Sequence, residues 1–118
     1  MLEVLIVDDD PSQLHIRAAV LRSAGLAVHI ATTVDSALTF LRGAGDKVGL
    51  VITDHLLPER SGADLVREMR LTMASMPVLV LTGMPGIEDE YEGLNVSVRL
   101  KPLNPDEFIR IARQLVSG

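Results

Sequence analysis

Residues 50–62 (LVITDHLLPERSG) restrict the possible folds of this chain more than any other stretch. The stretch begins with a short apolar run rich in β-branched side chains, which favours a buried strand over a helix and ends at Asp54. Pro58 can neither join a strand ladder nor continue a helix, so a loop follows, and Ser61 with Asp64 is typical of the cap of a next helix. Asp54 is therefore expected at the carboxyl end of a strand, where open α/β sheets bind ligands. A single aspartate there is also an ordinary turn or capping residue, so the rest of the chain has to decide.

Four more segments have the composition of strands. Residues 2–7 and 77–82 are nearly continuous apolar runs, as in strands covered on both faces, whereas residues 96–100 alternate like a half-exposed edge strand and residues 26–31 form a weaker one. Three of these strands end in reactive side chains, which are Asp8 and Asp9 after the first, Thr82, and Lys101.

Helical patterns separate the strands. Helix starts are predicted at Asp10, Thr33, Ser61 and Asn104, and the third of these helices is expected from about Gly62 to Met73. Between residues 84 and 94, one proline and two glycines leave room for at most two helical turns. Five strands alternating with about five helices predict an α/β fold with a doubly wound parallel sheet, helices on both faces in three α/β/α layers, and a short fourth helix.

A parallel sheet brings all the carboxyl ends of its strands to one edge, so Asp8, Asp9, Asp54, Thr82 and Lys101 should converge. Oxygen ligands without histidine or cysteine favour a hard ion such as Mg²⁺. A carboxylate such as Asp54 can act as a nucleophile towards phosphorus, while a metal ion, a lysine and a hydroxyl stabilise the phosphoryl oxygens. The constellation therefore indicates phosphoryl chemistry.

Length and composition exclude several function classes. A chain of 118 residues can form one domain with a hydrophobic core but not two, and the absence of cysteine rules out disulfides and thiolate metal sites. A formal net charge of -5 without a basic run argues against nucleic-acid binding by this domain. The first residues resemble neither a signal peptide nor a membrane span, so we expect a cytoplasmic protein that does not bind membranes.

Four motifs of the chain, VLIVDDDP, LVITDHLLPERSG, VLVLTG and VRLKP, resemble the successive signatures of the response-regulator receiver domain. The resemblance covers essentially residues 1–118 as one domain, and it implies a flavodoxin-like strand order 2-1-3-4-5. It further implies that Asp54 accepts a phosphoryl group from a phosphohistidine on a sensor histidine kinase or a histidine phosphotransfer protein. The same likeness implies a monomer or a weak homodimer, standing alone or cut from a longer hybrid kinase or regulator.

The resemblance also assigns roles to the other site residues. Asp9 and Asp54 would ligate Mg²⁺, or Mn²⁺, together with the backbone carbonyl of Leu56, while Asp8 would act through water. Thr82 and Lys101 match the hydroxyl and the lysine of the family. The Lys101–Pro102 bond is expected to be cis. Leu56 and Met84 would flank the path of the water that hydrolyses the acyl phosphate.

Two features depart from the family pattern. Val98 occupies the position of an aromatic residue that commonly reports phosphorylation, and the segment between Thr82 and Lys101 is short. Both features resemble those of receivers in hybrid kinases or phosphorelays, and they predict a reduced conformational switch unless another residue, such as Tyr91, takes over this role. His55 lies beside the site with no partner evident from the sequence.

Two other functions fit parts of the sequence. Asp8, Asp10 and Ser12 match the D-x-D-x-[ST] motif of haloacid-dehalogenase-like phosphatases, but those enzymes need further acids after their lysine and a longer chain. An unphosphorylated pseudo-receiver on the same fold would act as a binding module, which the intact set of five site residues argues against.

Overall fold

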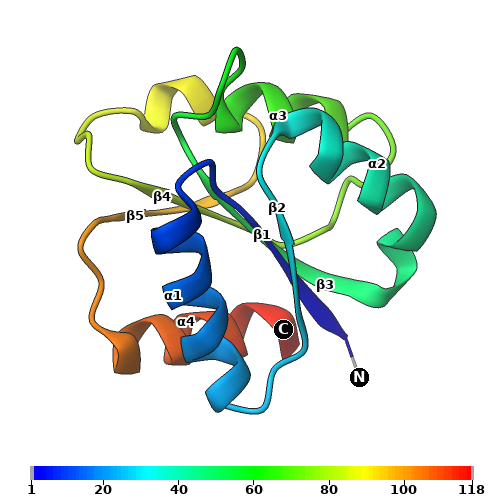
Figure 1. Ribbon diagram of the computed structural model, residues 1–118. Helices are drawn as coiled ribbons and strands as arrows, with labels where there is room; N and C mark the ends of the chain where they lie inside the picture. Colours follow the sequence, from blue (N-terminus) through cyan, green and yellow to red (C-terminus); the bar gives the residue numbers. More distant parts are fainter. Residues whose placement is uncertain (1, 118) are drawn as a thin grey trace.

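The computed structural model describes residues 2–117 as one five-stranded parallel sheet flanked by helices (Figure 1). The strands are β1 (Glu3–Val7), β2 (Val28–Ala31), β3 (Val48–Asp54), β4 (Val78–Thr82) and β5 (Ser97–Leu100). The α-helices are α1 (Pro11–Ser23), α2 (Val34–Ala44), α3 (Gly62–Met69) and α4 (Pro105–Ser117), and two 3-10 turns are η1 (Gly45–Lys47) and η2 (Glu88–Tyr91). The strand order is β2-β1-β3-β4-β5, which confirms the predicted flavodoxin-like arrangement.

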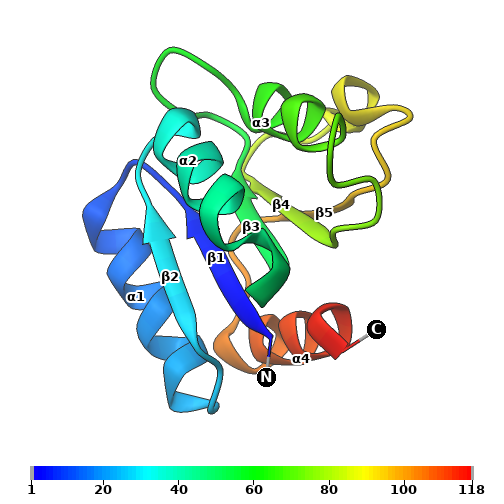
Figure 2. The same ribbon diagram turned by 90° about the vertical axis from the view of Figure 1, so that its right-hand side faces the viewer.

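Helices lie on both faces of the sheet (Figure 2), and an apolar layer holds them on each face. On one face, α1 and α4 pack against side chains such as Ile6, Leu50 and Leu79. On the other face, α2, α3 and η2 pack against Leu5, Val51 and their neighbours. The central strands β1, β3 and β4 are thus covered on both sides, which explains why their sequences are continuous rather than alternating apolar runs.

All four predicted helix starts carry their capping signals, and at the start of α4 the side chain of Asn104 accepts a hydrogen bond from the backbone N–H of Glu107. Asp10 accepts hydrogen bonds from the backbone N–H groups of Ser12 and Gln13, and Thr33 forms a capping box at the start of α2. Ser61 and Asp64 form the same reciprocal pair at the start of α3, and the backbone hydrogen bond from Ser61 lowers the pKa of the Asp64 carboxyl. These local signals fix where each helix begins after its strand.

Two helix predictions need correction. Helix α3 ends at Met69 rather than at about Met73, because the following residues turn back and Arg70 donates hydrogen bonds to the carbonyl oxygens of Leu94 and Asn95 in the loop before β5. Residues 84–94 form only the single 3-10 turn η2, within the predicted limit of two helical turns, so the described residues form four α-helices where about five helices were expected. Two glycines with positive φ, at positions 86 and 93, enclose η2 and prevent a longer helix.

Other predictions about the sheet are confirmed. Strand β5 lies at an edge with its second half exposed, and the Lys101–Pro102 peptide bond that follows it is cis. Over the part of the chain that the structure describes, none of the helices combines the length and the apolarity needed to cross a bilayer.

Candidate functional site

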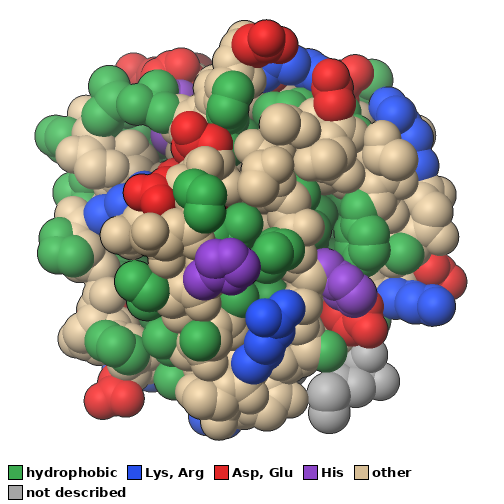
Figure 3. All heavy atoms as spheres, in the orientation of Figure 1, with side chains coloured by type: hydrophobic (Ala, Val, Ile, Leu, Met, Phe, Trp, Pro, Cys, Tyr) green, Lys and Arg blue, Asp and Glu red, His purple; other side chains and the backbone are tan. Residues whose placement is uncertain are grey.

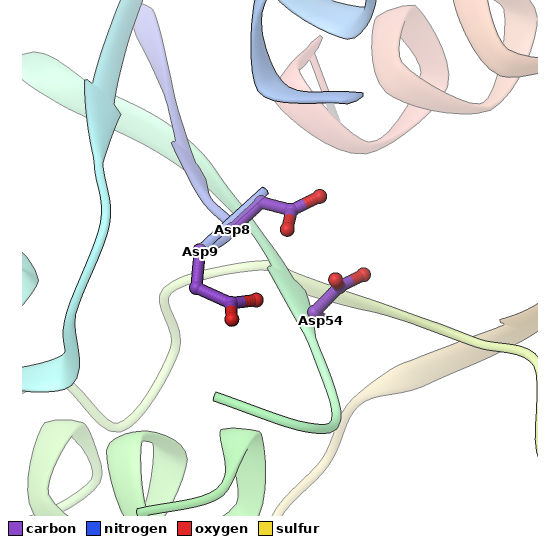
Figure 4. Close-up of side chains that lie close together, drawn as sticks. All are labelled: Asp8, Asp9 and Asp54. Carbon is purple, nitrogen blue, oxygen red and sulfur yellow. The ribbon is translucent and has the colours of Figure 1, made fainter. Parts of the chain in front are cut away.

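The carboxyl ends of β1 and β3 bring three aspartates together (Figure 4). The two strands pair in parallel with Val7 opposite Thr53, so Asp8 and Asp54 follow at neighbouring positions. One carboxylate oxygen from each of Asp8, Asp9 and Asp54 lies within 4.8 Å of the other two. Asp8 and Asp54 are buried and Asp9 is exposed, so this acidic cluster is open to solvent on one side.

Asp54 is held next to a lysine. The Lys101 ammonium reaches over from the end of β5 and lies 2.6 Å from Asp54 Oδ1. Burial raises the pKa of the Asp54 carboxyl from 3.8 to about 6, the hydrogen bond from Lys101 opposes this rise, and the negative charge of Asp8 adds to it. A carboxyl with this pKa is still mostly ionised at pH 7, so Asp54 keeps the lone pairs that a nucleophile needs.

Asp8 has two partners that sequence reasoning did not identify. Its Oδ1 accepts a hydrogen bond of 2.9 Å from the backbone N–H of Asp10, and its Oδ2 lies 2.5 Å from Nη1 of Arg17. Arg17 comes from α1 and also lies 3.5 Å from Asp54 Oδ1. The helical spacing indicates only that Arg17 lies beside the buried face of α1, because it is three residues after Leu14 and four before Leu21, both buried, and it does not identify Asp8 as its partner. The site therefore contains a second cation.

Thr82 ends β4, and its side chain is buried. Its hydroxyl oxygen accepts a hydrogen bond of 2.9 Å from the backbone N–H of Met84, and its O–H is 3.5 Å from the Met84 carbonyl oxygen. Lys101 N–H donates to the carbonyl oxygen of Thr82, which ties β5 to β4 at this edge. The structure thus brings Asp8, Asp9, Asp54 and Lys101 into direct proximity, while the hydroxyl of Thr82 is engaged with its own loop.

The loop after Asp54 begins with a fixed backbone and an exposed side chain. The backbone N–H of His55 donates to Leu81, and its carbonyl oxygen accepts from Gly62. Leu56 follows and is 63% exposed, and Met84 in the loop after β4 is 46% exposed. Near the end of β1, on the upper left of the face in Figure 3, acidic and basic side chains lie side by side with apolar side chains around them.

His55 has the partners that the sequence did not reveal. Its side chain is buried, with Nδ1 2.8 Å from the hydroxyl of Tyr91 and Nε2 3.2 Å from a carboxylate oxygen of Glu90. One neutral tautomer satisfies both contacts, with the Tyr91 O–H donating to Nδ1 and the Nε2–H directed to Glu90. The residue after Asp54 is thereby linked to η2, whereas Val98 is only half-buried in β5. The expectation of a reduced switch stays a prediction.

Removal of the Tyr91 hydroxyl should destabilise the protein. In Tyr91→Phe, the buried Nδ1 of His55 loses its partner, and the free energy of unfolding should fall by about 1–2 kcal/mol in urea titrations. In a His55→Leu background, Tyr91→Phe should lower the free energy of unfolding clearly less, because the imidazole nitrogen that would be left without a partner is no longer present. A Tyr91→Phe variant as stable as the wild type would contradict this assignment of the hydrogen bond.

Comparison with known proteins identifies the family. A family model for the response regulator receiver domain matches residues 4–113. The chain belongs to this receiver-domain family. The receiver domain is 29% identical over 111 residues to the cell cycle response regulator CtrA of Brucella ovis, and this alignment covers 92% of the chain and 47% of that protein. The chain therefore spans about half the length of such relatives.

Solved receiver structures share the fold over nearly the whole chain. The chemotaxis protein CheY4 of Vibrio cholerae matches with a TM-score of 0.88 and 26% identity over 98% of both chains. A response regulator receiver protein from Pseudomonas putida matches with a TM-score of 0.86 and 26% identity over 96% of both chains. The chain is thus a receiver domain of two-component signalling rather than a conventional enzyme, and the family match argues against the haloacid-dehalogenase-like alternative.

Proposed function

We propose that Asp54 is the phosphoacceptor of this receiver domain and takes a phosphoryl group from a phosphohistidine on a sensor histidine kinase or a histidine phosphotransfer protein. An Asp54 carboxylate oxygen attacks phosphorus, the P–N bond breaks, and its electron pair returns to the imidazole nitrogen, which takes up a proton. The observation that carries this proposal is the pairing of Asp54 with Lys101 at 2.6 Å, beside two more carboxylates at one sheet edge.

The acidic cluster fits a divalent cation. Its three donors are carboxylates within 4.8 Å of one another, a hard and purely oxygen set that suits Mg²⁺, with Mn²⁺ as a substitute. We assign the ion to Asp8, Asp9 and Asp54, with the backbone carbonyl of Leu56 as a further ligand. When bound, such an ion neutralises charge on the phosphoryl oxygens.

Lys101 and Thr82 support the transfer from the neighbouring strands. The ammonium of Lys101 holds the acceptor carboxylate in place and offers a positive charge to the phosphoryl oxygens that arrive there. The hydroxyl of Thr82 is fixed as an acceptor by the N–H of Met84, while its own hydrogen is only weakly engaged at 3.5 Å. That hydrogen is available to a phosphoryl oxygen.

The setting of the domain follows from the same assignment. We infer that residues 1–118 form one receiver domain, alone or within a longer regulator or hybrid kinase, that it acts in the cytoplasm, and that it is a monomer or a weak homodimer. Its formal net charge of -5 disfavours nucleic acid as a direct partner of this domain.

The proposal predicts labelling by a small phosphodonor. Wild-type protein incubated with acetyl phosphate and Mg²⁺ should gain one phosphoryl group in intact-mass measurements, and a chelator should abolish the gain. Asp54→Asn should show none, whereas Asp46→Asn, a change of the same kind at an exposed carboxylate in η1, should label like the wild type. Equal labelling of wild type and Asp54→Asn would sink the assignment, and a protein that binds no Mg²⁺ would favour the pseudo-receiver.

A further inference from the structure

Arg17 is the most deeply placed cation of the site. Its side chain is 14% exposed, against 31% for Lys101, and its guanidinium contacts both buried acids, Asp8 at 2.5 Å and Asp54 at 3.5 Å. These contacts join α1 to the ends of β1 and β3. Neither the phosphoacceptor role of Asp54 nor the receiver fold by itself requires an arginine here.

Helix geometry and packing explain how Arg17 reaches the acids. The buried face of α1 carries Leu14, Ala18 and Leu21, and Arg17 lies beside this face. The residue also borders a groove with Leu81 and Phe108, and its charged end reaches the carboxylates. The two ion pairs and the low exposure of the side chain restrain the guanidinium beside the acids.

Both carboxylate oxygens of Asp8 have a partner in this arrangement. One of its oxygens accepts the N–H of Asp10 and the other pairs with Arg17, so each carboxylate oxygen already has a partner. A divalent cation attracted to Asp8 and Asp54 would meet the positive charge of Arg17 on the same two groups. Two like charges on one carboxylate pair compete, and the competition is strong where burial limits solvent screening.

We propose that Arg17 is a positioning residue that acts as the resident counter-ion of Asp8 and Asp54 and competes with the divalent cation for them. This inference rests on the proposed function. Arg17 keeps the buried acids paired when no ion is bound, and the ion binds by displacing or sharing these contacts. The charges of the site are therefore balanced before the ion binds, and the affinity for the ion is lower than it would be without Arg17.

The expected effect is tighter ion binding when the competitor is removed. Arg17→Gln should bind Mg²⁺ roughly tenfold more tightly than the wild type, as the loss of one unit charge a few ångström from the ion would produce. Arg17→Lys, which keeps the charge, should stay within about threefold of the wild type. Arg42→Gln removes the same charge from an exposed position on α2 and should leave the affinity unchanged.

Affinity can be read from backbone amide shifts during a Mg²⁺ titration, without any phosphodonor. In the same titration of wild type, the Nε–H signal of Arg17 should move together with the amides of Asp9 and Asp54, a result that depends on no variant. An Arg17→Gln affinity equal to or below that of the wild type, or a stationary Arg17 signal in a protein that binds Mg²⁺, would overturn this inference alone. If the wild type binds no Mg²⁺, the inference and the proposed ion site fail together.

Discussion

Asp54→Asn should raise the free energy of unfolding by about 1–3 kcal/mol at pH 7 in chelator-containing buffer. Folding buries this carboxyl and raises its pKa from 3.8 to about 6, so keeping it ionised in the native state at neutral pH costs about 3 kcal/mol. The Asn side chain carries no charge to desolvate and no repulsion from Asp8. The pKa of about 6 already includes the opposing effect of Lys101, and the gain stays below the full cost because the buried amide leaves polar atoms without hydrogen-bond partners.

The pH dependence of this effect has a definite sign. Because the pKa of Asp54 is higher in the folded protein than in the unfolded chain, the folded state binds more protons between about pH 4 and pH 6. The contribution of Asp54 to stability is therefore greatest below the unfolded value of 3.8 and is lost as the pH rises through about 6. The stability difference between Asp54→Asn and wild type should grow over this window and be small below it.

Urea unfolding at several pH values measures this difference. Asp46→Asn, which changes an exposed carboxylate in η1, serves as the matched control and should follow the wild type within about 0.5 kcal/mol. A stability gain for Asp54→Asn that is the same at pH 4 and pH 7 would show that desolvation of the carboxylate is not its cause. No gain at either pH would contradict the charge balance described for the site.

The predictable part of the site is the part that strand ends determine. A short apolar run that ends at Asp8 or Asp54 predicts a buried strand and places the aspartate at its carboxyl end. Parallel pairing of the strands then brings these aspartates to one edge of the sheet. The fold and the acidic cluster therefore follow from local patterns plus a general rule of topology. Lys101 could be predicted in the same way, because it also follows directly after a strand.

Contacts made by long side chains between elements were not predictable in this way. Arg17 lies in the middle of a helix, and only the three-dimensional packing of α1 on the sheet decides that its charged end meets Asp8. The hydrogen bond between His55 and Tyr91 joins residues 36 positions apart across a loop without a regular pattern. Helix α3 was predicted too long for a related reason, since the hydrogen bonds of Arg70 to the loop before β5 favour the turn that ends it.

A second large effect is expected for the lifetime of the phosphorylated protein. The double variant Leu56→Asn with Met84→Glu should lose its phosphoryl group roughly tenfold faster than the wild type, since groups that orient an attacking water contribute rate factors of at least that size. The two wild-type side chains follow neighbouring strand ends, because Asp54 pairs with Leu81 in the sheet, and both are exposed beside the acceptor. Neither side chain can orient a water molecule for attack on phosphorus by hydrogen bonding, so the wild-type acyl phosphate is expected to decay slowly.

The decay of the phosphoryl group is followed by intact mass after the phosphodonor is removed. Leu71→Glu makes the best control, because this leucine is 81% exposed in the turn after α3 and the change introduces the same charge away from the site. This control should decay at the wild-type rate, which separates water positioning from a general effect of charge. The backbone N–H of Met84 donates a hydrogen bond to the hydroxyl of Thr82, which fixes the backbone at position 84. We therefore expect the carboxylate of the glutamate introduced there to be able to face Asp54. A double variant that retains its phosphoryl group as long as the wild type would show that Leu56 and Met84 do not limit the access of water.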